Sequence, residues 1–306
     1  MLKRTFFAIA ALLLAAGTAS AKELKSVGIT VGSLGNPFFV ALVKGAADEA
    51  KQINPNVNVT TASADYDLNK QFTQIDNFIA SGVDLILVNA ADPKAIGAAV
   101  KRAEAAGIVV VAVDVAAAGA NATVQTNNPQ AGQIACQYLA DKIGGKGNVI
   151  IENGPQVSAV IDRVKGCKEV LGKFPGIKIL SDDQDGKGSR EGGLNAMQGY
   201  LTRFPDIQGV FTINDPQAIG SDLAAKQLNR SGIVITSVDG APDAIAAIKS
   251  GNSLLQATAS QNPTEIGKRA VQVGYDIMNG KKPAQPEILL ASTLVTRDNA
   301  ASYKGW

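Results

Sequence analysis

The run Gly35-Asn36-Pro37-Phe38-Phe39 places one side-chain amide beside two aromatic rings. The amide of Asn36 can donate one hydrogen bond and accept another, whereas Phe38 and Phe39 offer flat apolar faces. A sugar has hydroxyls around its edge and C–H groups on its faces, so this combination suits carbohydrate recognition. Two phenylalanines at the start of a helix can equally be core residues, and the run alone does not decide between packing and binding.

Polar side chains also follow several apolar runs that are typical of buried strands. These side chains are Asn89 after Leu85–Val88, Asp114 after Val109–Val113, Asn214 and Asp215 after Val210–Ile213, Asp239 after Ile233–Val238, and Gln261 after Leu254–Thr258. Ligands of open parallel sheets bind at the carboxyl ends of strands. Asn and Asp also cap helices and begin turns, which is our first interpretation of Asp65, Asp92 and Asp215. The whole set, in both halves of the chain, indicates a site for a polyhydroxylated ligand.

Short β-branched runs alternate with helical patterns along most of the chain, which predicts an α/β fold with doubly wound parallel sheets. The expected strands are Val27–Val31, Val57–Thr61, Leu85–Val88, Val109–Val113, Val149–Ile151, Ile177–Leu180, Gly209–Ile213, Ile233–Val238 and Leu254–Thr258. The expected helices include Phe39–Ile53, Pro93–Ala106, Ala131–Ile143, Val160–Phe174, Pro216–Leu228 and Pro263–Asn279. Many of the strands are continuously apolar, as in sheets that are covered on both faces.

The alternation breaks at the polar stretch Asn121–Gln130 and then restarts, which marks a change of lobe. The helix pattern Pro263–Asn279 and the tail after Gly280 do not continue the second lobe, and we expect them to return to the first.

Residues 1–21 have the features of a secretory signal peptide: Lys3 and Arg4, then an apolar stretch, then Ala19-Ser20-Ala21 before the expected cleavage. The chain has 29 Lys+Arg and 27 Asp+Glu, and the signal holds two of the basic residues, so the mature chain balances 27 against 27. This balance gives no reason to expect a nucleic-acid or membrane-surface partner.

The sequence contains no histidine, which removes the commonest general base and the commonest metal ligand. We expect no catalytic residues, no metal site and no cofactor. The two cysteines, Cys136 and Cys167, lie in separate helical patterns. In an exported protein we expect them to form a disulfide, although two buried thiols are the alternative.

The ordered set Asn36-Pro37-Phe38-Phe39, Asn89, Asp114, Ser158-Ala159…Arg163…Gly166, Asn214-Asp215, Val238-Asp239-Gly240 and Gln261 resembles the periplasmic ribose-binding-type proteins, the sugar-binding components of ABC importers. The likeness covers nearly all of residues 25–295. It implies two Rossmann-like lobes joined by a three-crossing hinge that closes around a neutral monosaccharide, a pentose-like sugar or a polyol.

The resemblance also implies where the parts of such a protein lie. The crossings would fall near Thr126–Asn127, Gln261 and Leu290, so that residues 22–126 and 262–290 form one lobe and residues 127–261 and 291–306 the other. The ligand-binding residues carried over are Asn36, Phe38, Phe39, Asn89, Asp114, Arg163, Asn214, Asp239 and Gln261. We expect a periplasmic monomer that delivers its ligand to an ABC permease in the inner membrane.

Two departures from the ribose binders put D-ribose itself in doubt. Val115 stands where those proteins have an arginine, and the loop Asp185–Arg190 lacks an aromatic residue, with Gly188 at that place. Phe38 and Phe39 would then be the main apolar wall of the site. The alternatives are a chemotaxis or quorum receptor of the same fold and, with less support, an exported carbohydrate-active enzyme that uses paired carboxylates such as Asp114 and Asp239. A repressor of this fold would need an N-terminal DNA-binding domain in place of the signal.

Overall fold

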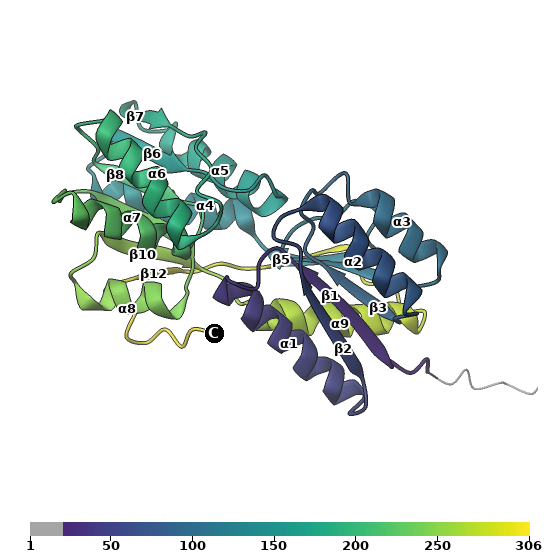
Figure 1. Ribbon diagram of the computed structural model, residues 1–306. Helices are drawn as coiled ribbons and strands as arrows, with labels where there is room; N and C mark the ends of the chain where they lie inside the picture. Colours follow the sequence, from purple (N-terminus) through teal and green to yellow (C-terminus); the bar gives the residue numbers. More distant parts are fainter. Residues whose placement is uncertain (1–20) are drawn as a thin grey trace, which may run out of the picture.

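The computed structural model describes residues 21–306, and the predicted signal peptide lies almost entirely outside this range. The described chain forms two α/β lobes side by side, each built around its own six-stranded sheet (Figure 1). The strand order is β11-β5-β4-β3-β1-β2 in the first sheet and β12-β10-β9-β8-β6-β7 in the second. The predicted fold class is therefore confirmed.

The first sheet is parallel throughout and has helices on both faces (Figure 1). Its strands are β1 (Ser26–Val31), β2 (Asn58–Ser63), β3 (Leu85–Val88), β4 (Val109–Val113), β5 (Ala122–Thr126) and β11 (Glu287–Leu290). Its helices are α1 (Pro37–Ile53), α2 (Leu68–Ala80), α3 (Gly97–Ala105) and α9 (Pro263–Met278). Helix α9 packs on α1.

The second sheet is parallel except for its edge strand β12, which pairs antiparallel with β10. Its strands are β6 (Lys146–Glu152), β7 (Gly176–Ser181), β8 (Gly209–Thr212), β9 (Val234–Asp239), β10 (Leu255–Ser260) and β12 (Leu294–Thr296). Its helices are α4 (Asn128–Lys142), α5 (Ser158–Leu171), α6 (Arg190–Arg203), α7 (Asp215–Gln227) and α8 (Pro242–Ser250).

The chain passes between the two sheets at three places: from β5 into α4, from β10 into α9, and from β11 to β12. The sequence pattern missed β5, β11 and β12. Strand β5 includes the polar residues Gln125 and Thr126, and it lies in the polar stretch Asn121–Gln130 where the alternation breaks. Strands β11 and β12 have only four and three residues and are partly exposed, so they give neither a periodic pattern nor a fully buried apolar run.

A disulfide joins Cys136 of α4 to Cys167 of α5, with the two Cα atoms 5.1 Å apart, so the predicted bridge is confirmed. The same two helices touch through glycine. A Cβ atom at Gly132 would lie 2.1 Å from the carbonyl oxygen of Arg163, and one at Gly166 would lie 2.2 Å from that of Pro129. Close glycine packing and the disulfide together fix helix α5, which carries Arg163 toward the space between the lobes.

Among residues 21–306, no helix has both the length and the apolar character needed to cross a membrane.

The C-terminal segment ends near the start of α1 (Figure 1). There the Trp306 ring packs edge-on against Phe38, with centroids 6.1 Å apart. Its indole N–H donates to the carbonyl oxygen of Asp239 at 3.0 Å, so Trp306 contacts both lobes.

Candidate functional site

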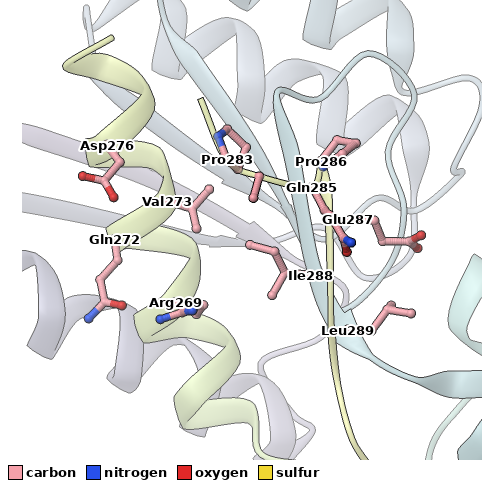
Figure 2. Close-up of a pocket in the computed structure, with 11 residues that line it drawn as sticks. Arg269, Gln272, Val273, Asp276, Pro283, Gln285, Pro286, Glu287, Ile288 and Leu289 are labelled. Carbon is pink, nitrogen blue, oxygen red and sulfur yellow. The ribbon is translucent and has the colours of Figure 1, made fainter. Parts of the chain in front are cut away.

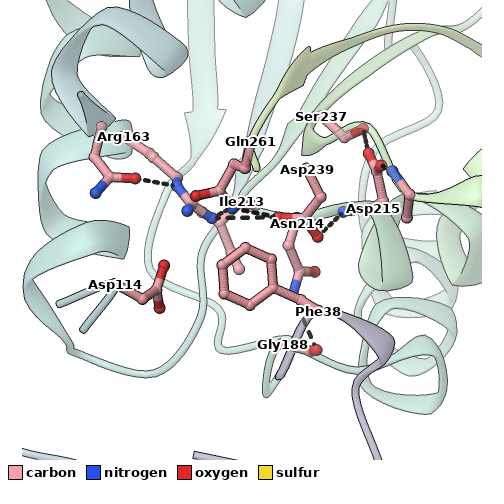
Figure 3. Close-up of polar contacts among 12 residues, drawn as sticks. Phe38, Asp114, Arg163, Gly188, Ile213, Asn214, Asp215, Ser237, Asp239 and Gln261 are labelled. Atoms are coloured by element: carbon pink, nitrogen blue, oxygen red, sulfur yellow. Dashed lines mark hydrogen bonds and ion pairs between the residues drawn. The ribbon is translucent and has the colours of Figure 1, made fainter. Parts of the chain in front are cut away.

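A cavity of about 430 Å³ lies between the lobes, where the strands of both sheets end. All nine residues proposed from the sequence line it: Asn36, Phe38, Phe39, Asn89, Asp114, Arg163, Asn214, Asp239 and Gln261. Figure 3 shows that Asp114, Arg163 and Asp239 face a common space beside the Phe38 ring. The parallel strands of both sheets explain why Asn89, Asp114, Asn214, Asp239 and Gln261 converge, since parallel strands present their carboxyl ends at one edge.

The first lobe holds its polar residues by local hydrogen bonds. Asn36 is the N-cap of α1, and its side-chain oxygen accepts from the Phe38 N–H at 3.0 Å. The Asn89 amide accepts from the Gly32 N–H at 3.1 Å and donates to Asp114 Oδ2 at 3.0 Å. Asn89 therefore orients Asp114, whose backbone φ of +65° is the left-handed conformation that Asp and Asn tolerate best.

In the second lobe, hydrogen bonds hold Arg163 and Asp239 close together. Arg163 donates through Nε to Asn128 Oδ1 and through Nη1 to the Ile213 carbonyl oxygen, each at 2.9 Å, and Nη1 lies 3.9 Å from Asp239 Oδ1. The Asp239 carboxyl accepts its hydrogen bonds from other groups: Oδ1 from Gln261 Nε2 at 2.7 Å and Oδ2 from the Asp215 N–H at 3.4 Å. The guanidinium and both of its neighbours are thereby fixed before any ligand arrives.

Several polar atoms at the cavity have no protein partner among the described residues. Asp114 Oδ1 and Gln261 Oε1 are buried acceptors without a donor. Arg163 Nη2 is a donor that forms no hydrogen bond with the described part of the chain, because the bonds of this side chain use Nε and Nη1. Leaving a buried polar group unpaired costs free energy, so a molecule that both donates and accepts hydrogen bonds would be stabilised in this cavity.

Burial dominates the electrostatics of the cavity. It raises the pKa of Asp114 from 3.8 to about 6, against the opposing effects of the Arg163 charge and the Asn89 hydrogen bond. Burial and the neighbouring Asp215 carboxyl raise the pKa of Asp239 well above its usual range, again against Arg163. Two carboxyl groups and one guanidinium do not favour an anionic guest, whereas hydroxyl donors would stabilise both carboxylates.

Our first interpretation of Asp215 as a cap or turn residue is wrong. Asn214 is the N-cap of α7, since its Oδ1 accepts from the Gln217 N–H at 3.1 Å. Asp215 is fully buried and accepts from the hydroxyls of Ser237 and Thr258 and from the Ala241 N–H. It ties the ends of β9 and β10 to the start of α7. Sequence position alone could not separate this role from capping.

Glu152, at the end of β6, is a second buried carboxyl that supports the site without lining the cavity. It accepts from Ser221 at 2.7 Å and from Gln217 Nε2 at 2.9 Å, and burial raises its pKa to about 8. The same Gln217 side chain accepts from the Gly188 N–H at 2.8 Å. Glu152 and Gln217 therefore hold the loop that carries Gly188.

The cavity also has a wall residue that the sequence reasoning missed. Tyr66, in the loop between β2 and α2, lines the cavity and packs edge-on against Phe39 with ring centroids 6.5 Å apart. The expectation that Phe38 and Phe39 form the main aromatic wall is therefore incomplete. Val115, at the place where ribose binders have arginine, is buried in the hydrophobic core and offers the cavity no donor.

A larger hollow of about 1430 Å³ lies elsewhere, along α9 and the segment 283–289 of the first lobe (Figure 2). It is a groove with Val273, Ile288 and Leu289 on its walls and charged groups spread around its rim. None of the nine proposed residues lines it. Within residues 21–306 no group of three or more acidic or cysteine side chains is arranged to hold a metal ion.

Comparison with known proteins agrees with this geometry. The chain is 37% identical over 267 residues to a ribose import binding protein of Bacillus subtilis, covering 85% of this chain and 84% of the relative. It is 32% identical to a xylitol-binding protein of Mycolicibacterium smegmatis, covering 93% and 81%.

Its structure is similar to that of an ABC transporter solute-binding protein from Bacillus halodurans solved with bound myo-inositol. The TM-score is 0.84 at 25% identity, covering 94% of this chain and 99% of that one. The family model of the periplasmic binding protein domain matches residues 27–282. With two lobes that enclose a polar cavity, and with these relatives, the chain belongs to the periplasmic binding protein family.

Proposed function

We propose that this protein captures a neutral sugar or polyol in the cavity between its lobes and presents it to an ABC permease. The proposal rests on two buried acceptors, Asp114 Oδ1 and Gln261 Oε1, which have no donor within residues 21–306, and on Arg163 Nη2, which donates to no group in that range. A polyhydroxylated molecule satisfies all three, because each hydroxyl both donates and accepts. The rings of Phe38, Phe39 and Tyr66 would cover its apolar faces.

The same unpaired atoms explain why a ligand would favour closure of the two lobes. With the lobes together and the cavity empty, Asp114 Oδ1 and Gln261 Oε1 are buried without a donor among the described residues, which disfavours the closed form. A carbohydrate supplies donors that reach both lobes only when they are closed, so it shifts the population toward closure. The hydrogen bonds to the carboxylates are charge-assisted and strengthen as water leaves.

The ribose, xylitol and myo-inositol that the relatives bind or import define a class of small neutral polyols rather than one ligand. We therefore propose a pentose-like sugar or a polyol, with the protein acting as a periplasmic monomer and not as an enzyme. Recovery of chemically unchanged carbohydrate after long incubation would support the absence of catalysis. Sedimentation of the purified protein with and without carbohydrate tests the monomer.

Isothermal titration of the mature protein with neutral pentoses, hexoses, pentitols and inositols tests the binding proposal. We expect at least one to bind, and Asp239→Ala to weaken that binding by about 10- to 150-fold through loss of hydrogen bonds to a charged group. Asp298→Ala, which removes an exposed carboxylate, is the matched control and should bind as the wild type does. Binding of no neutral carbohydrate would refute the proposed function, and normal binding by Asp239→Ala would refute the site.

A further inference from the structure

Two hollows between the lobes adjoin each other and share part of their walls. The inner one is the cavity of about 430 Å³ described above, and an outer one of about 1080 Å³ lies beyond it. Asn36, Tyr66 and Gly188 line both. Residues that border two adjoining spaces form the partition between them, and here the partition joins side chains of the first lobe to a loop of the second.

Tyr66 is held in place from its own lobe. A Cβ atom at Gly32 would lie 2.6 Å from Tyr66 Cε1, so the ring rests directly on the Gly32 backbone. The Tyr66 N–H donates to the Gly32 carbonyl oxygen at 3.1 Å, and Phe39 packs edge-on against the ring. Asp65 and Tyr66 both have positive φ, +53° and +57°, a turn that directs the Tyr66 side chain toward the cleft.

Gly188 is the surface that Tyr66 meets across the cleft. A Cβ atom built on Gly188 would lie 3.6 Å from the Tyr66 hydroxyl oxygen and 3.5 Å from Asn214 Nδ2. The Gly188 backbone is fixed at both ends, since its N–H donates to Gln217 Oε1 at 2.8 Å and its carbonyl accepts from Asn214 at 3.0 Å. A larger side chain here would occupy the place that the Tyr66 hydroxyl now takes.

We propose that Tyr66, meeting Gly188 across the cleft, is the partition that closes the ligand cavity and selects short carbohydrates over longer ones. This inference rests on the proposed function and adds to it the residue that sets ligand length. Within the described chain the Tyr66 hydroxyl makes no hydrogen bond, so it is available to a ligand hydroxyl as donor or acceptor. A longer ligand has to displace the ring or leave the cleft open.

The outer hollow provides room for the extra length once the partition is removed. Its walls include Lys187, Ser189 and the ion pair of Arg190 with Asp243, all groups that hydrate readily and can accept further hydroxyls. Replacing Tyr66 with alanine would join the two hollows. The inner cavity would keep the carboxyl and guanidinium groups that recognise the ligand.

The test uses two matched pairs of probes, D-ribose with D-allose and xylitol with D-glucitol, in which the second member has one more CHOH unit in its carbon chain. Isothermal titration gives the ratio of short-chain to long-chain affinity for wild type, Tyr66→Ala and Tyr66→Phe. Tyr138→Ala on helix α4, which does not line either hollow, is the matched control. Thermal melting of each variant verifies that it is folded.

We expect Tyr66→Ala to lower the ratio of short-chain to long-chain affinity at least about 10-fold. A difference of one methylene unit in a ligand typically changes its discrimination by a pocket by at least this factor. Tyr66→Phe should keep the ratio and lose about 2- to 10-fold in affinity for both members, the effect of one neutral hydrogen bond. An unchanged ratio in folded Tyr66→Ala would overturn the inference, as would the same change in Tyr138→Ala. Wild-type protein that binds no carbohydrate would instead refute the proposed function.

Discussion

Replacing Asp114 with asparagine should make the ligand-free protein more stable while it weakens ligand binding. The side chain is only 6% exposed, and its Oδ2 accepts from Asn89 while Oδ1 has no donor. Asparagine has nearly the same shape and tolerates the φ of +65° at this position. Its oxygen can keep the Asn89 hydrogen bond, but its NH₂ group then presents donors to the cavity where the wild type presents an acceptor.

The magnitude follows from the pKa of Asp114. An increase from 3.8 to about 6 makes the ionised form cost ~3 kcal/mol in the closed, ligand-free protein. This is an upper bound, because the lobes can open and rehydrate the carboxylate. A raised folded-state pKa means that the folded protein binds the proton more tightly than the unfolded chain does. The penalty is therefore complete above pH 6, shrinks between pH 6 and 3.8, and is absent below 3.8.

Thermal melts of ligand-free wild type and Asp114→Asn from pH 7.5 to pH 4 measure this effect. The variant should melt several degrees higher at pH 7.5, and the difference should disappear near pH 4. Its carbohydrate affinity at pH 7.5 should fall about 10- to 150-fold, because one hydrogen bond to a charged acceptor is lost.

Asp92→Asn is the control for the Asp114 substitution. Asp92 carries the same carboxyl group but lies outside the cavity, where it accepts from the backbone N–H groups of Lys94 and Ala95. It should show neither the stability gain nor the loss of affinity. Equal melting temperatures of wild type and Asp114→Asn at every pH, together with normal affinity, would refute the reasoning.

Three further predictions concern the aromatic residues and the disulfide. Phe38→Ala should weaken carbohydrate binding at least about 10-fold in titrations, since a buried ring is lost, whereas Val40→Ala, on the exposed side of α1, should not. Trp306 is the single tryptophan and contacts both lobes, so its fluorescence should change on ligand binding and Trp306→Phe should abolish the signal; constant emission would contradict the contact. Replacing Cys136 and Cys167 with alanine should lower the free energy of unfolding by about 3–4 kcal/mol in urea titrations, and a reductant should then have no further effect.

Local pattern was enough to predict the fold class and most of the elements. Continuously apolar runs such as Leu85–Val88 and Val109–Val113 mark strands buried on both faces, and both are present with the predicted bounds. The disulfide was predicted because the chain carries a secretory signal and its two cysteines lie in separate helical patterns. The short strands β11 and β12 were not predicted. They form by pairing with β5 and β10, respectively, which are distant in sequence, and such pairing leaves no periodic pattern in the short strands themselves.

The sequence by itself placed eight polar and aromatic residues near strand ends and helix starts, and the family resemblance added Arg163; the tertiary structure brings all nine to one cavity. Only the tertiary structure decided how each amide and carboxyl is used: Asn89 orients Asp114, whereas Asp215 ties strand ends together. It also decided that Tyr66 enters the cavity and meets Gly188, a contact across about 120 residues of sequence. Spacing along the chain determines which side chains leave the same edge of a sheet, but contacts between lobes depend on how the finished sheets face each other.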